Sequence, residues 1–150
     1  MNGVFTYITQ LKKLLLNRVR NSCDKNKYRI LIVEDSKLYS LLLNQVFKEC
    51  HELIVKCVYS GEECLDNLSW SPDVIILDHE LPGMTGLETL KEIRKAGKDT
   101  NVIVITDQDD IKIAIEYVNL GITKYINKSH ESKPIVKLIS YVKSLKPETV

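Results

Sequence analysis

Short apolar runs, rich in β-branched residues, alternate with longer segments of helical period along most of this chain. Five such runs occur, at residues 28–33, 53–58, 74–77, 102–105 and 124–126. Segments whose apolar residues recur three and four positions apart follow them, from residue 60 and near residues 37–49, 87–96, 111–120 and 135–145. This alternation is typical of a parallel sheet covered by helices. We therefore expect an α/β fold of five βα units, (βα)5.

The first apolar run, Tyr28–Val33, has the composition expected of a strand that is buried on both faces of a sheet. The helix after it carries apolar residues at core spacing, and we expect these to face the core: Leu38, Leu41, Leu42, Val46 and Phe47. Ser36 precedes this helix as its expected N-cap. Ser60 and Glu63 have the spacing of a capping box at the start of the next helix.

Residues 1–27 have a pattern of their own. Their apolar residues fall on one helical face: Val4, Ile8, Leu11, Leu15 and Val19. We expect an N-terminal amphipathic helix and linker over residues 1–27, one domain over residues 28–146, and a tail at residues 147–150. Packing of this helix on its own domain or on a second copy of the chain is favoured over contact with lipid or nucleic acid. A homodimer formed through this helix is therefore a hypothesis.

The composition sets the class of protein. A chain of 150 residues with 44% hydrophobic content suits one domain with a single core. The net charge is +1, but residues 1–27 carry six basic residues against one acid, so the basic character is local. This balance does not favour a nucleic-acid footprint over the whole surface. No apolar run reaches the roughly 20 residues needed to span a membrane.

The cysteines and the start of the chain predict the compartment. The four cysteines lack CxxC spacing, and we expect them to be free thiols. No secretory signal is visible, because Lys12 and Lys13 interrupt the first apolar stretch. These observations predict a cytoplasmic protein.

Polar side chains that could take part in binding or catalysis follow four of the predicted strands. The first strand ends in Glu34 and Asp35, and the third ends in Asp78. Thr106 follows the fourth strand, and Lys128 comes just after the fifth. In an open parallel sheet, ligands bind beyond the carboxyl ends of the strands. We therefore expect these five side chains to meet at one edge.

Three carboxylates in a partly dry crevice repel one another unless a cation compensates them. Mg²⁺ fits this role because it prefers oxygen ligands and often bridges carboxylates and a substrate phosphate. Asp35 and Asp78 are the predicted ligands, with the backbone carbonyl of Glu80 as a third. Asp78 is best placed as a nucleophile for a phosphoryl group, while Lys128 and Thr106 bind the phosphoryl oxygens.

Taken together, these residues resemble the receiver domain of two-component response regulators, over residues 28–146. Glu34 and Asp35 match the acidic, metal-binding pair of the family, and Asp78 matches its phosphoacceptor. The loop from Pro82 to Gly86 matches the Pro-Gly-Met-x-Gly loop of the family. Its switch hydroxyl, switch aromatic and lysine are matched in turn by Thr106, Tyr125 and Lys128.

This resemblance implies a doubly wound, flavodoxin-like sheet of strand order 2-1-3-4-5 and a Mg²⁺ cofactor. It also implies a phosphoryl donor, either a histidine kinase or a histidine phosphotransfer protein. Phosphorylation of Asp78 would draw Thr106 toward the phosphate and turn Tyr125 inward, which remodels the surface around the fifth strand. The resemblance implies no enzymatic activity beyond self-catalysed phosphoryl transfer and autodephosphorylation.

The predicted output is contact with a downstream protein. No residues follow the closing helix in this sequence to form an output domain, so we expect a stand-alone regulator without direct DNA binding. Two positions depart from the family pattern. Asp107 stands where a small residue usually follows the switch hydroxyl, and Ser129 stands where a proline usually follows the lysine. Both changes lie beside the phosphoryl pocket, where Asp107 would disfavour small anionic donors. The variable positions Glu80 and Gln108 tune phosphoryl lifetime in the family.

Three alternatives stay open at this point. A degenerate receiver would keep the fold for protein contacts alone. A phosphatase with an aspartate nucleophile, like haloacid dehalogenases, needs a second aspartate where this chain has Glu80. A flavodoxin needs a phosphate-binding loop after the first strand, where this chain has Glu34 and Asp35. The histidines show no zinc-site spacing, and we interpret them as surface or loop residues.

Overall fold

A single five-stranded parallel sheet forms the centre of the molecule. The structure is a computed structural model and describes residues 27–50, 52–129 and 133–147. Its strand order is β2-β1-β3-β4-β5, which confirms the predicted flavodoxin-like order. The strands are β1 (Tyr28–Val33), β2 (Leu53–Val58), β3 (Val74–Leu77), β4 (Asn101–Thr106) and β5 (Lys124–Asn127). The N-terminal helix predicted within residues 1–27 and most of the tail lie outside the described residues.

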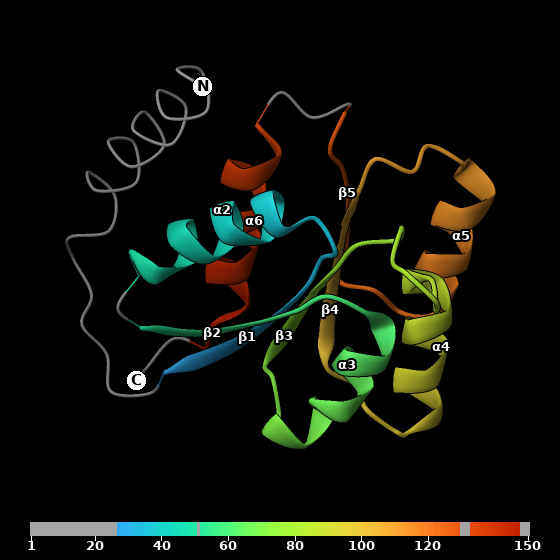
Figure 1. The fold of residues 1–150 in the computed structure, drawn as a ribbon, viewed down its shortest axis with the longest axis horizontal. Helices are drawn as coiled ribbons and strands as arrows, with labels where there is room; N and C mark the ends of the chain where they lie inside the picture. The colour runs from blue at the N-terminus through green and yellow to red at the C-terminus, as the bar shows by residue number, and fades with distance from the viewer. Residues whose placement is uncertain (1–26, 51, 130–132, 148–150) are drawn as a thin grey trace.

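Helices cover both faces of this sheet (Figure 1). The helices are α2 (Lys37–Lys48), α3 (Gly61–Asp66), α4 (Gly86–Lys95), α5 (Ile111–Asn119) and α6 (Pro134–Leu145). Helices α2 and α6 lie on one face, and α3, α4 and α5 lie on the other. A short 3₁₀ turn at Leu68–Trp70, which the sequence analysis did not predict, follows α3. In the described part of the chain, no helix is both long and apolar enough to cross a membrane.

The sheet separates two hydrophobic cores. Ile30 and Ile32 of β1 belong to the core under α2 and α6, while Leu31 and Val33 belong to the core under α4. Successive side chains of a strand point to opposite faces, so an apolar strand fills both cores at once. All four of these side chains have no exposed surface. The prediction that the first strand is buried on both faces is confirmed.

The buried face of α2 differs from the predicted one. Leu43, Val46 and Phe47 are buried, but Leu38 is 65% exposed and Leu41 is 62% exposed. The helix carries two overlapping apolar stripes, and spacing alone does not say which stripe faces the sheet. The prediction that Leu38 and Leu41 belong to the core is therefore wrong.

Side-chain caps fix the starts of α2 and α3. Ser36 caps α2 as predicted, since its hydroxyl accepts a hydrogen bond from Tyr39 N at 3.3 Å. Ser60 accepts from Glu63 N, but the Glu63 carboxylate accepts from Tyr59 N rather than from Ser60. The predicted capping box is therefore incomplete, because the Glu63 carboxylate binds the backbone N–H one residue before the N-cap.

Both edge strands carry a lysine whose ammonium lies over an aromatic ring. On β2, Lys56 Nζ lies 5.3 Å from the centroid of the Trp70 ring. On β5, Lys124 Nζ lies 4.8 Å from the centroid of the Tyr141 ring. These distances are within the range of cation–π attraction.

Candidate functional site

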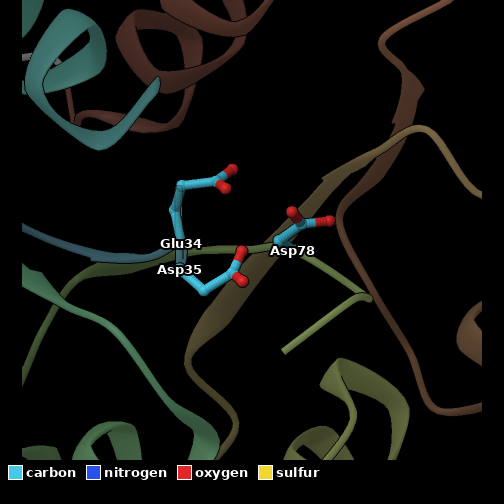
Figure 2. A group of neighbouring side chains, drawn as sticks. All are labelled: Glu34, Asp35 and Asp78. Atoms are coloured by element: carbon cyan, nitrogen blue, oxygen red, sulfur yellow. The ribbon is translucent and has the colours of Figure 1, made fainter. Parts of the chain in front are cut away.

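Three carboxylates gather at the carboxyl edge of the sheet, as the sequence predicts. Glu34, Asp35 and Asp78 each offer one oxygen, and these oxygens lie within 4.8 Å of one another. Figure 2 shows the side chains of Glu34 and Asp35 directed from the end of β1 toward the side of Asp78, which follows β3. Glu34 and Asp78 are almost fully buried, whereas Asp35 is exposed. Solvent therefore reaches this acidic cluster from the Asp35 side.

Lys128 completes the cluster from the end of β5. Its Nζ lies 2.8 Å from Glu34 Oε2 and 3.1 Å from Asp78 Oδ2. A hydrogen bond from Lys128 N to Thr106 O at 2.8 Å fixes the backbone of the lysine against β4. The structure thus brings four of the predicted residues, Glu34, Asp35, Asp78 and Lys128, into one constellation.

Burial and charge act against each other in this cluster. Burial raises the pKa of the Glu34 carboxyl above its usual range, the Lys128 hydrogen bond lowers it, and the charge of Asp78 raises it again. For Lys128, burial lowers the pKa of the ammonium, but the contacts with Glu34 and Asp78 outweigh this effect and raise it. These contacts therefore favour the charged form of the lysine.

The donor set of this cluster fits Mg²⁺. Carboxylate oxygens are hard ligands, and Mg²⁺ is commonly held by one or two of them. Both oxygens of Glu34 already accept hydrogen bonds, one from Ser36 N at 3.1 Å and the other from Lys128. Asp35, the exposed member, is therefore the carboxylate most open to a metal. Glu80 is exposed in the loop after Asp78, and its carbonyl as a ligand stays a prediction.

The loop between β3 and α4 is closed by backbone hydrogen bonds. Gly86 N donates to His79 O at 2.8 Å, and His79 N donates to Asp78 Oδ1 at 2.7 Å. Thr85 and Glu88 form a complete capping box at the start of α4. A Cβ built on Gly86 would lie 2.0 Å from Asp78 O, so only glycine fits against the backbone of Asp78. This loop was predicted from the sequence, whereas its capping box was not.

The predicted switch residues lie on the neighbouring strands. Thr106 is fully buried at the end of β4, and its Oγ1 accepts a hydrogen bond from Gln108 N at 3.2 Å. Tyr125 is half-buried on β5, and its hydroxyl donates to Gln108 O at 2.8 Å. Asn127 Nδ2 donates to the same carbonyl at 3.2 Å. The loop after β4 is thus fastened by side chains of β5.

The two residues that depart from the family pattern contact each other. Ser129 Oγ donates to Asp107 Oδ1 at 2.7 Å, and both residues are exposed. The Ser129 backbone N–H also donates to Asn127 Oδ1 at 2.8 Å. No cis peptide bond occurs among the residues described here. The side-chain contact between Asp107 and Ser129 therefore links the loops that follow β4 and β5.

A buried His79–Tyr117 pair was missed by sequence reasoning. His79 lies in the loop after β3, which agrees with its interpretation as a surface or loop residue, but it is only 9% exposed and is therefore not a surface residue. Its Nδ1 lies 2.9 Å from the hydroxyl of Tyr117, a fully buried residue of α5. The Tyr117 ring lies 5.9 Å from the Tyr125 ring, centroid to centroid. Burial raises the pKa of the Tyr117 phenol, and the charges of Tyr125 and Asp78 add to this effect.

Comparisons with known proteins identify the family of this chain. The model of the response regulator receiver domain family matches residues 30–140. The chain therefore belongs to the response regulator receiver domain family, which acts in two-component signalling. A protein-glutamate methylesterase/protein-glutamine glutaminase of Trichodesmium erythraeum is 36% identical over 122 residues, which are 78% of this chain and 34% of that protein.

Relatives of two other kinds match as well. Protein CcdB of Bacillus subtilis is 25% identical, and the match covers 76% of this chain and 96% of that protein. The receiver domain of Francisella response regulator 1452 has a TM-score of 0.71 at 27% identity, covering 79% of this chain and 96% of that one. The chain spans between 34% and 58% of the lengths of three curated relatives, the Trichodesmium protein among them.

Proposed function

We propose that this chain accepts a phosphoryl group on Asp78 from a phosphohistidine donor and thereby controls a protein partner. The observation that carries the proposal is the constellation of three carboxylates and Lys128 at one sheet edge. The donor would be a histidine kinase or a histidine phosphotransfer protein. No activity beyond self-catalysed phosphorylation and dephosphorylation is proposed for residues 28–146.

In the proposed transfer, an oxygen of Asp78 attacks the phosphorus atom of the phosphohistidine. The P–O bond forms while the P–N bond breaks, and the imidazole nitrogen keeps the electron pair of the broken bond. Lys128, 3.1 Å from Asp78 Oδ2, is close enough to donate hydrogen bonds to a phosphoryl oxygen on that side. Bound Mg²⁺, held by Asp35, Asp78 and the Glu80 carbonyl with Glu34 nearby, would neutralise phosphoryl charge.

Thr106 and Tyr125 are the proposed switch pair. The Thr106 hydroxyl accepts a hydrogen bond from Gln108 N and still has a proton to donate to a phosphoryl oxygen. Movement of Thr106 toward Asp78 would disturb Gln108, whose carbonyl accepts from Tyr125. The proposed readout is therefore a changed surface at α5, β5 and α6. Helix α5 already exposes Ile111, Ile115 and Val118 there.

The remaining proposals concern the whole chain. Residues 28–146 form the proposed receiver unit, and residues 1–27 the proposed helix for dimerisation or docking. Deleting residues 1–24 should change the oligomeric state or partner binding, and an unchanged result in both would remove that idea. We place the protein in the cytoplasm with its phosphodonor, and we propose output through a protein rather than through DNA.

Intact-protein mass spectrometry tests phosphorylation most directly. Incubation with Mg²⁺ and phosphoramidate should add one phosphoryl group, and chelation of Mg²⁺ should abolish the addition. Asp78→Asn should remove the adduct, while Asp99→Asn, an exposed aspartate between α4 and β4, should keep it. If the small donor fails, the same assay with Asp107→Ala and with a phosphohistidine protein follows. Absence of an adduct in all of them would favour a receiver that acts through protein contacts alone.

A further inference from the structure

A third group holds Lys128 besides the two carboxylates. The ammonium Nζ of Lys128 lies 4.3 Å from the centroid of the Tyr39 ring, which is within the range of a cation–π contact. The side chain of Lys128 is only 14% exposed, so this contact is largely shielded from water. The ring and the two carboxylates together surround the ammonium group.

The position of Tyr39 is set by the same segment that supplies the acidic pair. Tyr39 lies in the first turn of α2, and its backbone N–H donates to the hydroxyl of Ser36, the N-cap. Ser36 N in turn donates to Glu34 Oε1. The Tyr39 ring is partly buried and packs against the core beneath α2 and α6. A short chain of hydrogen bonds and packing therefore fixes the ring relative to the acids.

The ring differs chemically from the other two partners of the lysine. A metal ion at the acidic cluster would compete with Lys128 for the oxygens of Glu34 and Asp78. A neutral ring face has no oxygen lone pair directed at the metal, and it attracts the ammonium without cancelling its charge. The N–H groups of the lysine then stay available for a phosphoryl oxygen.

We propose that Tyr39 is a positioning residue for Lys128: its ring face holds the ammonium at the phosphoryl site when the carboxylates bind the metal. This inference rests on the function proposed above and adds a residue to it. Two other lysines lie over aromatic rings in the described part of the chain, Lys56 and Lys124 on the edge strands. Those pairs lie outside the acidic cluster and provide controls.

Two substitutions at position 39, one that keeps the aromatic ring and one that replaces it with an aliphatic side chain, test the proposal. Tyr39→Phe keeps the ring and should phosphorylate within about twofold of the unsubstituted chain at saturating phosphoramidate and Mg²⁺. Tyr39→Leu removes the ring and should slow the single-turnover rate by roughly 3- to 30-fold. Tyr141→Leu breaks the Lys124 contact and should leave the rate unchanged. Equal rates for Tyr39→Leu and the unsubstituted chain would overturn the proposal.

Fluorinated phenylalanines at position 39 distinguish positioning from packing. They change the electron density of the ring at nearly constant shape, so the rate should fall stepwise as fluorine atoms are added. A purely structural role would give a flat series and would also overturn the proposal. This series serves equally if Tyr39→Leu does not fold, which its thermal unfolding curve would reveal.

Nuclear magnetic resonance of the Lys128 ε-methylene group separates this inference from the proposed function. Ring current should shift these protons upfield in the unsubstituted chain and in Tyr39→Phe, and the shift should vanish in Tyr39→Leu. If the unsubstituted chain takes no phosphoryl group, the proposed function fails and the resonance alone decides the contact. Equal shifts in all three proteins would show that the ring does not hold the lysine.

Discussion

Two connections at the carboxyl edge of the sheet, the one that contains Asp78 and the one that follows β4, are built in different ways. Between β3 and α4, the chain is closed by its own backbone, with Leu81 N and Gly86 N both donating to His79 O. Between β4 and α5, the loop depends on side chains, since Gln108 O accepts from Tyr125 and Asn127. The first connection begins with Asp78, and the second follows Thr106, the proposed switch residue.

This difference separates a fixed half of the site from an adjustable half. Backbone hydrogen bonds around a glycine without room for a Cβ leave one geometry for the β3–α4 connection. Side-chain hydrogen bonds on a partly exposed loop exchange partners at a cost of about 1 kcal/mol each. If Asp78 is phosphorylated as proposed, we expect the β4–α5 connection to move more than the β3–α4 connection. The predictions below test this division.

The largest effect is expected at Gly86. A Cβ there would meet Asp78 O at 2.0 Å and the Tyr117 hydroxyl at 2.7 Å. Because the first of these is backbone, Gly86→Ala should lower the free energy of unfolding by about 3 kcal/mol or more. Urea denaturation measures this loss. Gly97→Ala is the control, since Gly97 has φ +69° but no neighbour near its would-be Cβ. Equal costs for the two variants would contradict the fixed geometry.

The buried His79–Tyr117 contact should come next. Tyr117→Phe keeps the ring in the core but removes the hydroxyl that lies 2.9 Å from His79 Nδ1. A buried polar atom left without its partner costs about 1–3 kcal/mol, and thermal or urea unfolding should register a loss in this range. Tyr59→Phe, at a 43% exposed tyrosine, should change stability little. If Tyr117→Phe left the free energy of unfolding unchanged, His79 would have found another hydrogen-bond partner at no cost.

A smaller and more local effect is expected at Tyr125. Tyr125→Phe removes the hydrogen bond to Gln108 O and should cost about 1 kcal/mol, because the group is only half-buried. Amide hydrogen exchange should speed up at the start of α5 while the β3–α4 connection stays protected. Equal acceleration in both connections would show that they do not behave as separate halves.

The smallest change in stability is expected at Ser129. Its hydrogen bond to Asp107 is exposed, so Ser129→Ala and Asp107→Ala should each change the free energy of unfolding by no more than about 0.5 kcal/mol. A double-mutant cycle on the pair measures their coupling directly. A coupling energy above about 1 kcal/mol would mean that the β4–α5 connection is held as firmly as the β3–α4 connection.

The sequence predicted the strands and the constellation well, for clear physical reasons. Strands buried on both faces are uniformly apolar, so their limits stand out from the polar residues that follow. Asp78 and Thr106 come at or just after the end of such a strand, and Lys128 comes just after the short edge strand β5. Parallel topology brings those ends together. For these residues, the apolar pattern of the strands is enough to predict that their side chains meet at one edge of the sheet.

Other features could not be predicted from the spacing of apolar residues, because they depend on the direction in which side chains point. Leu38 and Leu41 have helical spacing, but the rotation of α2 on the sheet leaves them exposed. His79 pairs with Tyr117 from a different helix, and Tyr39 reaches Lys128 from 89 positions earlier in the chain. Nothing in the spacing of these residues relates them to each other. Contacts of this kind are fixed only once two packed layers are in place.

The lysines on the edge strands have a consequence for behaviour at high protein concentration. An edge strand offers unpaired backbone groups to which a strand of another molecule could add. On β2 and β5, Lys56 and Lys124 are kept near the sheet by Trp70 and Tyr141. A second sheet approaching either edge would have to bury or displace that charge. The charge at each edge therefore disfavours fibre-like stacking through the sheet.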